Sequence, residues 1–334
     1  MHIGLLKRRE FITLIGAIAV SWPICAYAQL GTRMRRIGAM MLLAEDDPQQ
    51  KAWTEAFLLG LQEAGWTDRS NIQIDYRWGA GDAARARRYA AELVALAPDV
   101  ILAPGSAGLG PMLQATREIP IVFVHVPDPV GAGFVDSLAR PGGNATGFLL
   151  QEYGMSAKWL ELLKQIAPAV TRVAVVRDPA ISAGIGQWSA IQAVAPSAGV
   201  EVVPINLRNV AEIERTLGTF AQSANGGLIV TGSALATTHR DLIIGLAALH
   251  KLPAVYYERL FVTAGGLISY GADLADQYHR AGAYIDRILK GEKPADLPVQ
   301  APVKFDLAIN LKTAKTLGIE LPSMVIAQAT SVIE

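Results

Sequence analysis

Short aliphatic runs alternate with amphipathic stretches of helical length from Arg36 almost to the end of the chain. The runs at residues 37–43, 100–103 and 121–126 have the length and the branched side chains of buried strands. This alternation is typical of parallel sheets covered by helices, because parallel strands are joined by long crossover connections. With 334 residues, 51% of them apolar, the chain is long enough for two such packed domains.

The same rhythm restarts after a helix expected at residues 156–166, so the sequence predicts two successive α/β units. The elements beyond residue 265 are too few for a third domain, and we expect them to complete the two earlier sheets, with several crossings between the units. We also expect a long loop rich in Pro, Gly and Asp over residues 127–147, and one helix over residues 238–249.

Residues 1–28 have the layout of a secretory signal peptide. A basic start at residues 7–9 precedes an uncharged, mostly apolar stretch that ends in the small residues Ala26 and Ala28. The alternative is a membrane anchor, but a glycine and a proline interrupt the stretch, and a span needs about 20 clean apolar residues. We therefore expect cleavage after Ala28 and a periplasmic location.

The arginine pair Arg8 and Arg9, followed by Glu10, Phe11 and an aliphatic residue, looks like a twin-arginine export signal. The general secretory route is the alternative. The single cysteine of the chain, Cys25, lies inside the segment to be removed, so the mature chain is expected to have neither disulfide nor thiolate chemistry.

Charge and motifs exclude several classes of function. Lys and Arg (30) balance Asp and Glu (30), and no basic run is present that could follow a phosphate backbone, so we expect no nucleic-acid partner. The chain has no glycine-rich dinucleotide fingerprint after a strand, no phosphate-binding P-loop and no serine elbow. Its histidines do not have the spacing of metal ligands. The sequence therefore predicts no catalytic residues, no metal and no cofactor.

Polar and aromatic residues near the carboxyl ends of the predicted strands form the candidate ligand-binding site, because ligands of open parallel sheets bind outside those ends. Ser106 and Ser233 are expected to begin helices, where the hydroxyl and the nearby amides suit a carboxylate. The alternative is that each serine only caps its helix. Asp128, Asp178 and Glu258 are candidates for binding an ammonium group of the ligand, and the alternative is that each serves only within its own loop. The full set is Asp46, Ser106, Asp128, Tyr153, Asp178, Ser233, Glu258 and Tyr270.

The two tyrosines of this set, Tyr153 and Tyr270, lie near predicted linkers or strand ends. An aromatic ring there is placed to stack on a planar ligand. Core packing is the alternative for such rings.

Five segments of the chain resemble the ABC transporter substrate-binding protein family related to tryptophan- and tyrosine-binding lipoproteins. They read DPVGAG at 128–133, SLARPGGN at 137–144, AGGLISYG at 264–271, ILKGEKPADLP at 288–298 and NLKTA at 310–314. Two features depart from the family pattern. The loop at the end of the first strand is more acidic than expected, and the lipid-carrying cysteine of the amino-acid-binding relatives is absent.

The resemblance implies the fold of type I periplasmic binding proteins, an α/β architecture of two Rossmann-like lobes joined by three hinge crossings, with the solute in the cleft. The expected N-terminal lobe comprises residues 36–148 and 272–300. The C-terminal lobe then comprises residues 149–271 and 301–334.

We therefore expect a monomeric periplasmic solute-binding protein of an ABC importer rather than an enzyme. It would close two lobes on a small solute, an amino acid or related carboxylate, and present it to a permease in the inner membrane. One alternative is a two-lobed Rossmann-like enzyme such as a nucleotide-sugar transferase. Another is a cytoplasmic sensor domain of the same design, which the export signal opposes.

Overall fold

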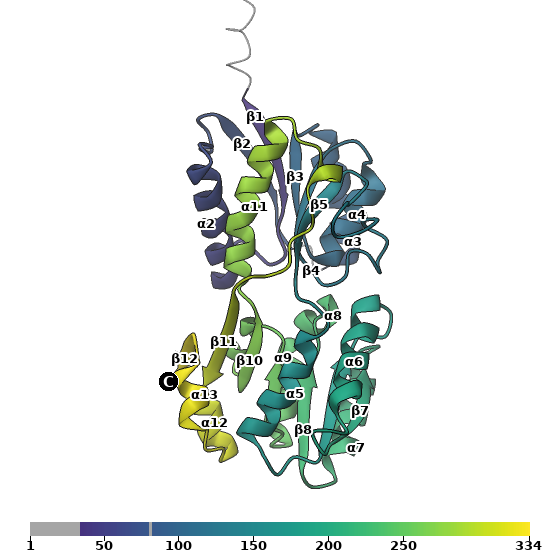
Figure 1. Cartoon of the computed structure of the whole chain (residues 1–334), viewed down its shortest axis with the longest axis vertical. Coiled ribbons are helices and arrows are strands. Elements are labelled where there is room, and N and C mark those ends of the chain that lie inside the picture. The colour runs from purple at the N-terminus through teal and green to yellow at the C-terminus, as the bar shows by residue number, and fades with distance from the viewer. Residues whose placement is uncertain (1–33, 80–81) are drawn as a thin grey trace, which may run out of the picture.

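The computed structural model describes residues 34–79 and 82–334, so the expected signal peptide at residues 1–28 lies outside the described part. The chain forms two lobes stacked along the long axis of the molecule, each with a central sheet flanked by helices (Figure 1). This arrangement confirms the predicted α/β fold with two Rossmann-like lobes. Within the described ranges, no helix is both long enough and apolar enough to span a bilayer.

The first lobe contains a five-stranded parallel sheet in the order β2-β1-β3-β4-β5. Its core strands are buried along most of their length, as expected for a sheet with helices on both faces. The strands are β1 (Arg35–Met40), β2 (Ile72–Arg77), β3 (Val100–Pro104), β4 (Ile121–Val126) and β5 (Ala145–Leu149), and the helices between them are α2 (Pro48–Glu63), α3 (Ala83–Ala95) and α4 (Gly105–Ala115).

The second lobe contains a seven-stranded sheet in the order β12-β11-β10-β9-β8-β6-β7, in which β10 and β11 are antiparallel. Its strands are β6 (Arg172–Arg177), β7 (Glu201–Asn206), β8 (Gly226–Val230), β9 (Ala254–Tyr256), β10 (Ile268–Ala272), β11 (Phe305–Asn310) and β12 (Ser331–Ile333). Its helices are α5 (Met155–Ile166), α6 (Ser182–Val194), α7 (Val210–Ala221), α8 (Ala234–Thr238), α9 (Arg240–Leu249), α10 (Arg259–Thr263), α12 (Leu311–Leu317) and α13 (Ser323–Ala327).

The chain passes between the lobes three times: after β5, after β10, and before β11. Between the last two crossings, helix α11 (Leu274–Leu289) returns to the first lobe and packs along α2, and the short helix η1 (Pro294–Asp296) follows it (Figure 1). Because the crossings join the carboxyl ends of both sheets, those ends face one another.

One expectation about an individual element is wrong, and one short helix was not expected. The expected loop over residues 127–147 ends in strand β5, which begins at Ala145 and pairs with β4. The first three residues of this strand are small and give no strand pattern in the sequence. Gly147 is required in it because a Cβ there would lie 1.9 Å from the Phe123 carbonyl oxygen. The helix expected over residues 238–249 is α9, which begins two residues later, at Arg240. The short helix α8 before it, which Ser233 caps, was not expected, and His239 (φ −100°, ψ 18°) separates the two helices.

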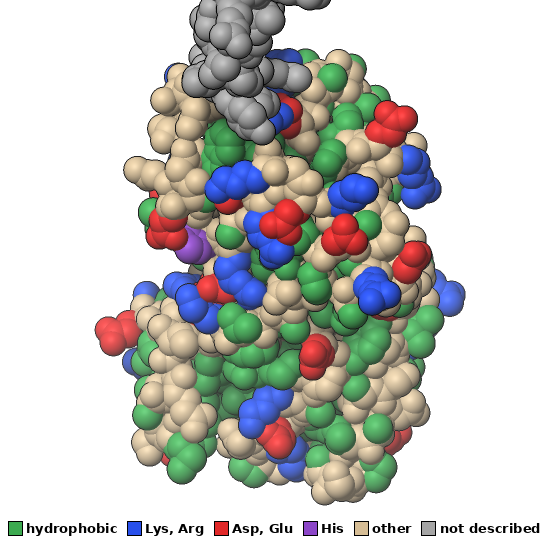
Figure 2. Space-filling view, turned by 45° about the horizontal axis from the view of Figure 1, so that its top comes forward, with side chains coloured by type: hydrophobic (Ala, Val, Ile, Leu, Met, Phe, Trp, Pro, Cys, Tyr) green, Lys and Arg blue, Asp and Glu red, His purple; other side chains and the backbone are tan. Residues whose placement is uncertain are grey.

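Lys and Arg side chains are interspersed with Asp and Glu side chains on the face shown in Figure 2. That face therefore has no continuous basic surface of the kind that follows a nucleic-acid backbone.

Helices α2 and α11 approach so closely that glycines are needed at their contact. A Cβ on Gly60 would lie 1.9 Å from the His279 carbonyl oxygen, and a Cβ on Gly282 would lie 2.4 Å from the Gly60 carbonyl carbon. Neither obstacle is the end of a flexible side chain, so the helices would have to move apart. The contact fixes α11, and with it the hinge that precedes it, against the first lobe.

We expect Gly60→Ala to lower the free energy of unfolding by about 2 kcal/mol, because the added methyl group meets backbone. Gly245→Ala in α9 is the matched control: its Cβ would have nothing within 4 Å, so the variant should gain about 0.5–1 kcal/mol from helix propensity. Urea unfolding of both variants measures the two values. Equal stability of the two variants would contradict the packing argument.

Candidate functional site

A cavity of about 420 Å³ lies between the lobes, at the carboxyl ends of β3 and β4 on one side and of β6, β8 and β9 on the other. This is the place where open α/β sheets bind ligands, and its volume is in the range of small-molecule sites. It is lined by Leu42, Leu43, Gly105, Ser106, Ala107, His125, Pro127, Leu150, Asp178, Ile181, Gly232, Ser233, Ala234, Thr237, Thr238, Arg240, Asp241 and Tyr257.

On the first lobe, Ser106 is the second residue of α4 and lies at the cavity. The N-cap position is Pro104, and no side chain caps the helix. The first amides of α4 therefore remain available at the end of the helix that attracts negative charge. Ser106 adds a hydroxyl donor beside them, as the sequence predicts for a carboxylate-binding serine.

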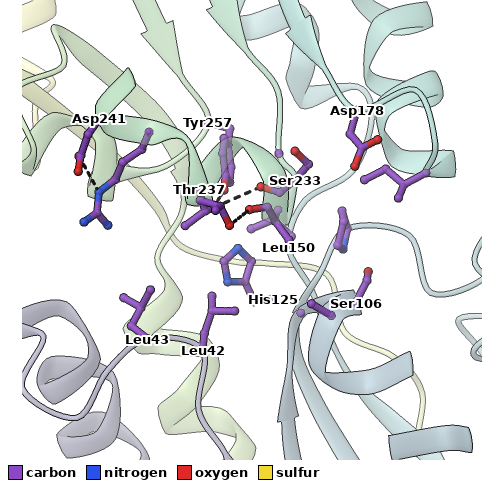
Figure 3. Close-up of a pocket in the computed structure, with 18 residues that line it drawn as sticks. Leu42, Leu43, Ser106, His125, Leu150, Asp178, Ser233, Thr237, Asp241 and Tyr257 are labelled. Carbon is purple, nitrogen blue, oxygen red and sulfur yellow. Dashed lines mark hydrogen bonds and ion pairs between the residues drawn. The ribbon is translucent and has the colours of Figure 1, made fainter. Parts of the chain in front are cut away.

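His125 enters the cavity from the end of β4 and lies near its centre (Figure 3). Its φ of 61° is uncommon for a side-chain-bearing residue, and the backbone is held there by a hydrogen bond from the His125 N–H to Oε1 of Gln277 on α11. The side chain is 6% exposed, and Nδ1 has no hydrogen-bond partner. Burial lowers the pKa of the imidazole to about 4, so His125 is neutral at pH 7.

On the second lobe, Asp178 follows β6 and is 6% exposed. Its Oδ1 accepts a hydrogen bond from the Ala180 N–H, which fixes the carboxylate in the loop. Helix α6 lies directly on this loop, because a Cβ on Gly184 would be 1.8 Å from the Asp178 carbonyl oxygen. A buried carboxylate at the edge of a cavity needs an opposed charge or several donors, so Asp178 is suited to a cationic group.

Ser233 caps α8, where its Oγ accepts a hydrogen bond from the Ala236 N–H. Next to it, Thr237 and Tyr257 are joined through their hydroxyl oxygens at 2.6 Å (Figure 3). Burial and the neighbouring Glu258 hold the pKa of the Tyr257 phenol well above its usual value, so this hydroxyl stays protonated. The three hydroxyl groups form a neutral polar wall on the second lobe.

Glu258 is brought close to His125 across the two lobes instead of lining the cavity. Its Oε2 lies 3.7 Å from His125 Nε2, too far for a hydrogen bond, and neither carboxylate oxygen has a hydrogen-bond partner among the described residues. The residue is 4% exposed, and burial raises its pKa to about 7, although the neighbouring Tyr257 hydroxyl and the charge of Arg240 act in the opposite direction. Protonated Glu258 is therefore substantially populated at neutral pH.

Asp128 and Tyr153 contact one another at the rim of the cleft. Tyr153 belongs to the segment that follows the first crossing, and its hydroxyl donates to Oδ2 of Asp128, while Oδ1 accepts from the Gly131 N–H. Partial burial raises the pKa of Asp128, but hydrogen bonds from Ser182, Tyr153 and Gly131 outweigh it, and the net pKa is lowered. Because Ser182 begins α6 and Tyr153 follows the first crossing, the bonds from these two residues join the two lobes.

The remaining predicted site residues lie outside the cavity lining. Asp46 is exposed in the loop between β1 and α2, beside the helix cap Asp47. Tyr270 is half-buried in β10 and stacks on Phe305, with ring centroids 5.8 Å apart. Of the eight predicted residues, Ser106, Asp178 and Ser233 line the cavity; ligand contact by any of the eight stays a prediction.

Several lining residues were not among the predicted set. Leu42, Leu43, Leu150 and Ile181 supply the apolar part of the lining, and their aliphatic side chains do not differ from ordinary core residues in the sequence. His125 occurs three residues before Asp128, at a strand end where polar side chains were expected, so its position in the strand was the available signal.

Residues 40–333 match the model of a protein family described as ABC transporter substrate binding protein. The chain belongs to this family. It is therefore a substrate-binding protein of an ABC transporter, a class that binds a small molecule and works with a membrane permease, and the enzyme alternative is not favoured.

The chain is 26% identical to a protein named tyrosine-binding protein from Clostridioides difficile, over 86% of this chain and 82% of the relative. It is also 26% identical to the ABC domain of Streptococcus pneumonia solved in complex with L-Trp, with a TM-score of 0.81 and coverage of 90% and 100%. A ligand-free, open substrate-binding protein with adhesive properties from Clostridium difficile has the same identity, coverage of 90% and 99%, and a TM-score of 0.69.

We expect Glu258→Gln to stabilise the protein at pH 8 and to have little effect at pH 4.5. The folded-state pKa of Glu258 is raised from 4.5 to about 7, so the folded state binds the proton more tightly. The contribution of this residue to stability is therefore fully present below pH 4.5 and lost as the pH rises through about 7. The gain in the variant should reach about 3 kcal/mol at most.

Urea unfolding of the wild type and the variant at the two pH values measures this difference. Glu161→Gln, which removes an exposed carboxylate from α5, is the control and should give the same difference at both pH values. A stability gain of Glu258→Gln that is independent of pH would contradict the assignment.

Proposed function

We propose that the protein is the exported, periplasmic receptor of an ABC importer and that it binds a free amino acid with an apolar or aromatic side chain. The observation that carries the proposal is the 420 Å³ cavity in which Ser106 and the start of α4 on one lobe face Asp178 on the other. An anion-binding helix end and a carboxylate suit the two charges of a zwitterion. The tyrosine-binding and L-Trp-bound relatives support the same class of solute.

In this proposal the ligand carboxylate binds the first amides of α4 and the hydroxyl of Ser106. The ammonium group binds Asp178, with Ser233 as a further polar contact. The ligand side chain lies against the apolar residues Leu42 and Leu43, whose burial adds about 25 cal/mol per Å² of apolar surface. No bond of the solute has to be broken, so we expect no enzymatic turnover and no cofactor.

Lobe closure traps the solute, because each lobe holds half of the site. At equal sequence identity and coverage, the structure superposes better on the L-Trp complex than on the open, ligand-free relative. This supports reading the contacts between the lobes as those of a closed state. The bond from Tyr153 to Asp128 and the contact of Asp128 with Ser182 would then form as the cleft closes.

Export and assembly complete the proposal. The basic start and apolar stretch of residues 1–28 support export, with Arg8 and Arg9 favouring the twin-arginine route. We expect a monomer, since one chain supplies both walls of the cavity.

We expect Asp178→Asn to weaken binding of L-tryptophan and L-tyrosine at least 10-fold, because the ammonium group loses its buried counter-charge. Isothermal titration calorimetry measures the dissociation constants. Glu214→Gln on the exposed face of α7 is the matched control and should leave them unchanged.

Native mass spectrometry of the purified wild-type protein identifies any solute that it retains. The proposed function fails if the wild type binds no amino acid in calorimetry and retains none. Equal affinity of wild type and Asp178→Asn would contradict the assigned ammonium site alone.

We expect Tyr153→Phe to raise the dissociation rate of the bound amino acid by about 3- to 10-fold, because the closed state loses one hydrogen bond to a carboxylate. Stopped-flow displacement measures this rate. Tyr89→Phe, which removes a hydroxyl from α3 on the first lobe, is the control. A dissociation rate equal to that of the wild type would show that the Asp128 contact does not hold the cleft closed.

A further inference from the structure

The cavity has a second polar end, separated from the one that the proposed zwitterion occupies. In Figure 3, Ser106 and Asp178 lie on one side of the cavity. Asp241 lies on the opposite side, with Leu42 and Leu43 toward the same side below it. The Arg240 Nε–H donates to Oδ1 of Asp241, so Arg240 belongs to that end of the cavity as well. A ligand held at Ser106 and Asp178 therefore extends its side chain along apolar surface toward a guanidinium group.

The residues around Arg240 compensate its positive charge poorly. Its ion pair with Asp241, 3.2 Å from Nε to Oδ1, is the one hydrogen bond that its side chain makes within the described residues. The Asp241 side chain is 80% exposed, so solvent screens this pair and it contributes little. Arg240 is also the first residue of α9, where the helix dipole disfavours a cation.

Partial burial of the Arg240 side chain makes its guanidinium a stronger ligand group than that of a surface arginine. The Arg240 side chain is 26% exposed, and it lines the cavity with Thr238 beside it. Its charge also acts on buried Glu258, whose pKa it lowers against the larger effect of burial. Since Glu258 is partly protonated at neutral pH, it does not neutralise Arg240 fully.

We propose that the bound amino acid has a side chain with an apolar body and a terminal oxygen group, preferably a carboxylate, that Arg240 binds. This inference rests on the proposed function, because it takes the zwitterion to lie at Ser106 and Asp178. An arginine binds a carboxylate through two parallel hydrogen bonds, and a phenolic oxygen through one. The apolar body lies against Leu42 and Leu43.

The test compares L-phenylalanine, L-tyrosine and 4-carboxy-L-phenylalanine, which share one ring and differ in the terminal group. Calorimetry should give the tightest binding for 4-carboxy-L-phenylalanine, at least 10-fold tighter than for L-phenylalanine, with L-tyrosine between them. In Arg240→Met, which keeps an extended side chain without charge, the preference should fall below about 3-fold. Arg240→Lys keeps the charge without the paired donors and should give an intermediate preference.

Arg215→Met removes an exposed arginine from α7 and is the matched control, which should keep the wild-type preference. A wild type that binds L-phenylalanine as tightly as 4-carboxy-L-phenylalanine overturns the inference and leaves the proposed function standing. The inference is also overturned if the preference survives in Arg240→Met. Failure to bind any amino acid overturns the proposed function and the inference together. Urea unfolding of the Arg240 variants verifies that each is folded.

Discussion

The carboxyl ends of two sheets face each other across one cavity, and each sheet contributes groups that are incomplete without the other. The first lobe supplies an uncapped helix end at α4 and a buried, neutral His125, while the second supplies the buried carboxylates of Asp178 and Glu258. Buried polar atoms without partners are costly, by about 1–3 kcal/mol each. In the proposed function, a solute in the cleft favours closure because it supplies the missing partners.

The fold could be predicted from the sequence because strand and helix periodicities are local. Where pairing with a distant segment decides an element, the prediction failed: β5 begins with three small residues, Ala145 to Gly147, and its strand identity comes from pairing with β4. The site residues also differ in whether local sequence predicts their position. Ser106 and Asp178 lie just after strands, so chain position places them at the cavity. Arg240 instead lies within the helix expected from residue 238, where no strand end marked it as a cavity residue.

Glu258 and His125 show why sequence position alone did not define the site. Glu258 follows a strand and His125 lies near the end of one. Burial shifts their pKa values in opposite directions: it raises the pKa of the carboxyl to about 7 and lowers that of the imidazole to about 4. Sequence spacing predicts that such residues meet at a sheet edge, but not how much water the second lobe excludes from them. That depends on how the two lobes meet, and contacts such as those of Asp128 with Tyr153 and Ser182 join segments that are separate in the chain.

In the proposed binding mode, selectivity among solutes comes more from the cost of leaving a buried charge without a partner than from attraction between charges. A solute without an ammonium group would leave Asp178 buried and unpaired once the lobes close, and removing a partner from a buried charge costs about 3–5 kcal/mol. Arg240 imposes a milder condition, because its side chain keeps partial contact with solvent. In the proposed binding mode, the cleft therefore rejects solutes that lack the zwitterion strictly, and it grades the remaining amino acids by the end of the side chain.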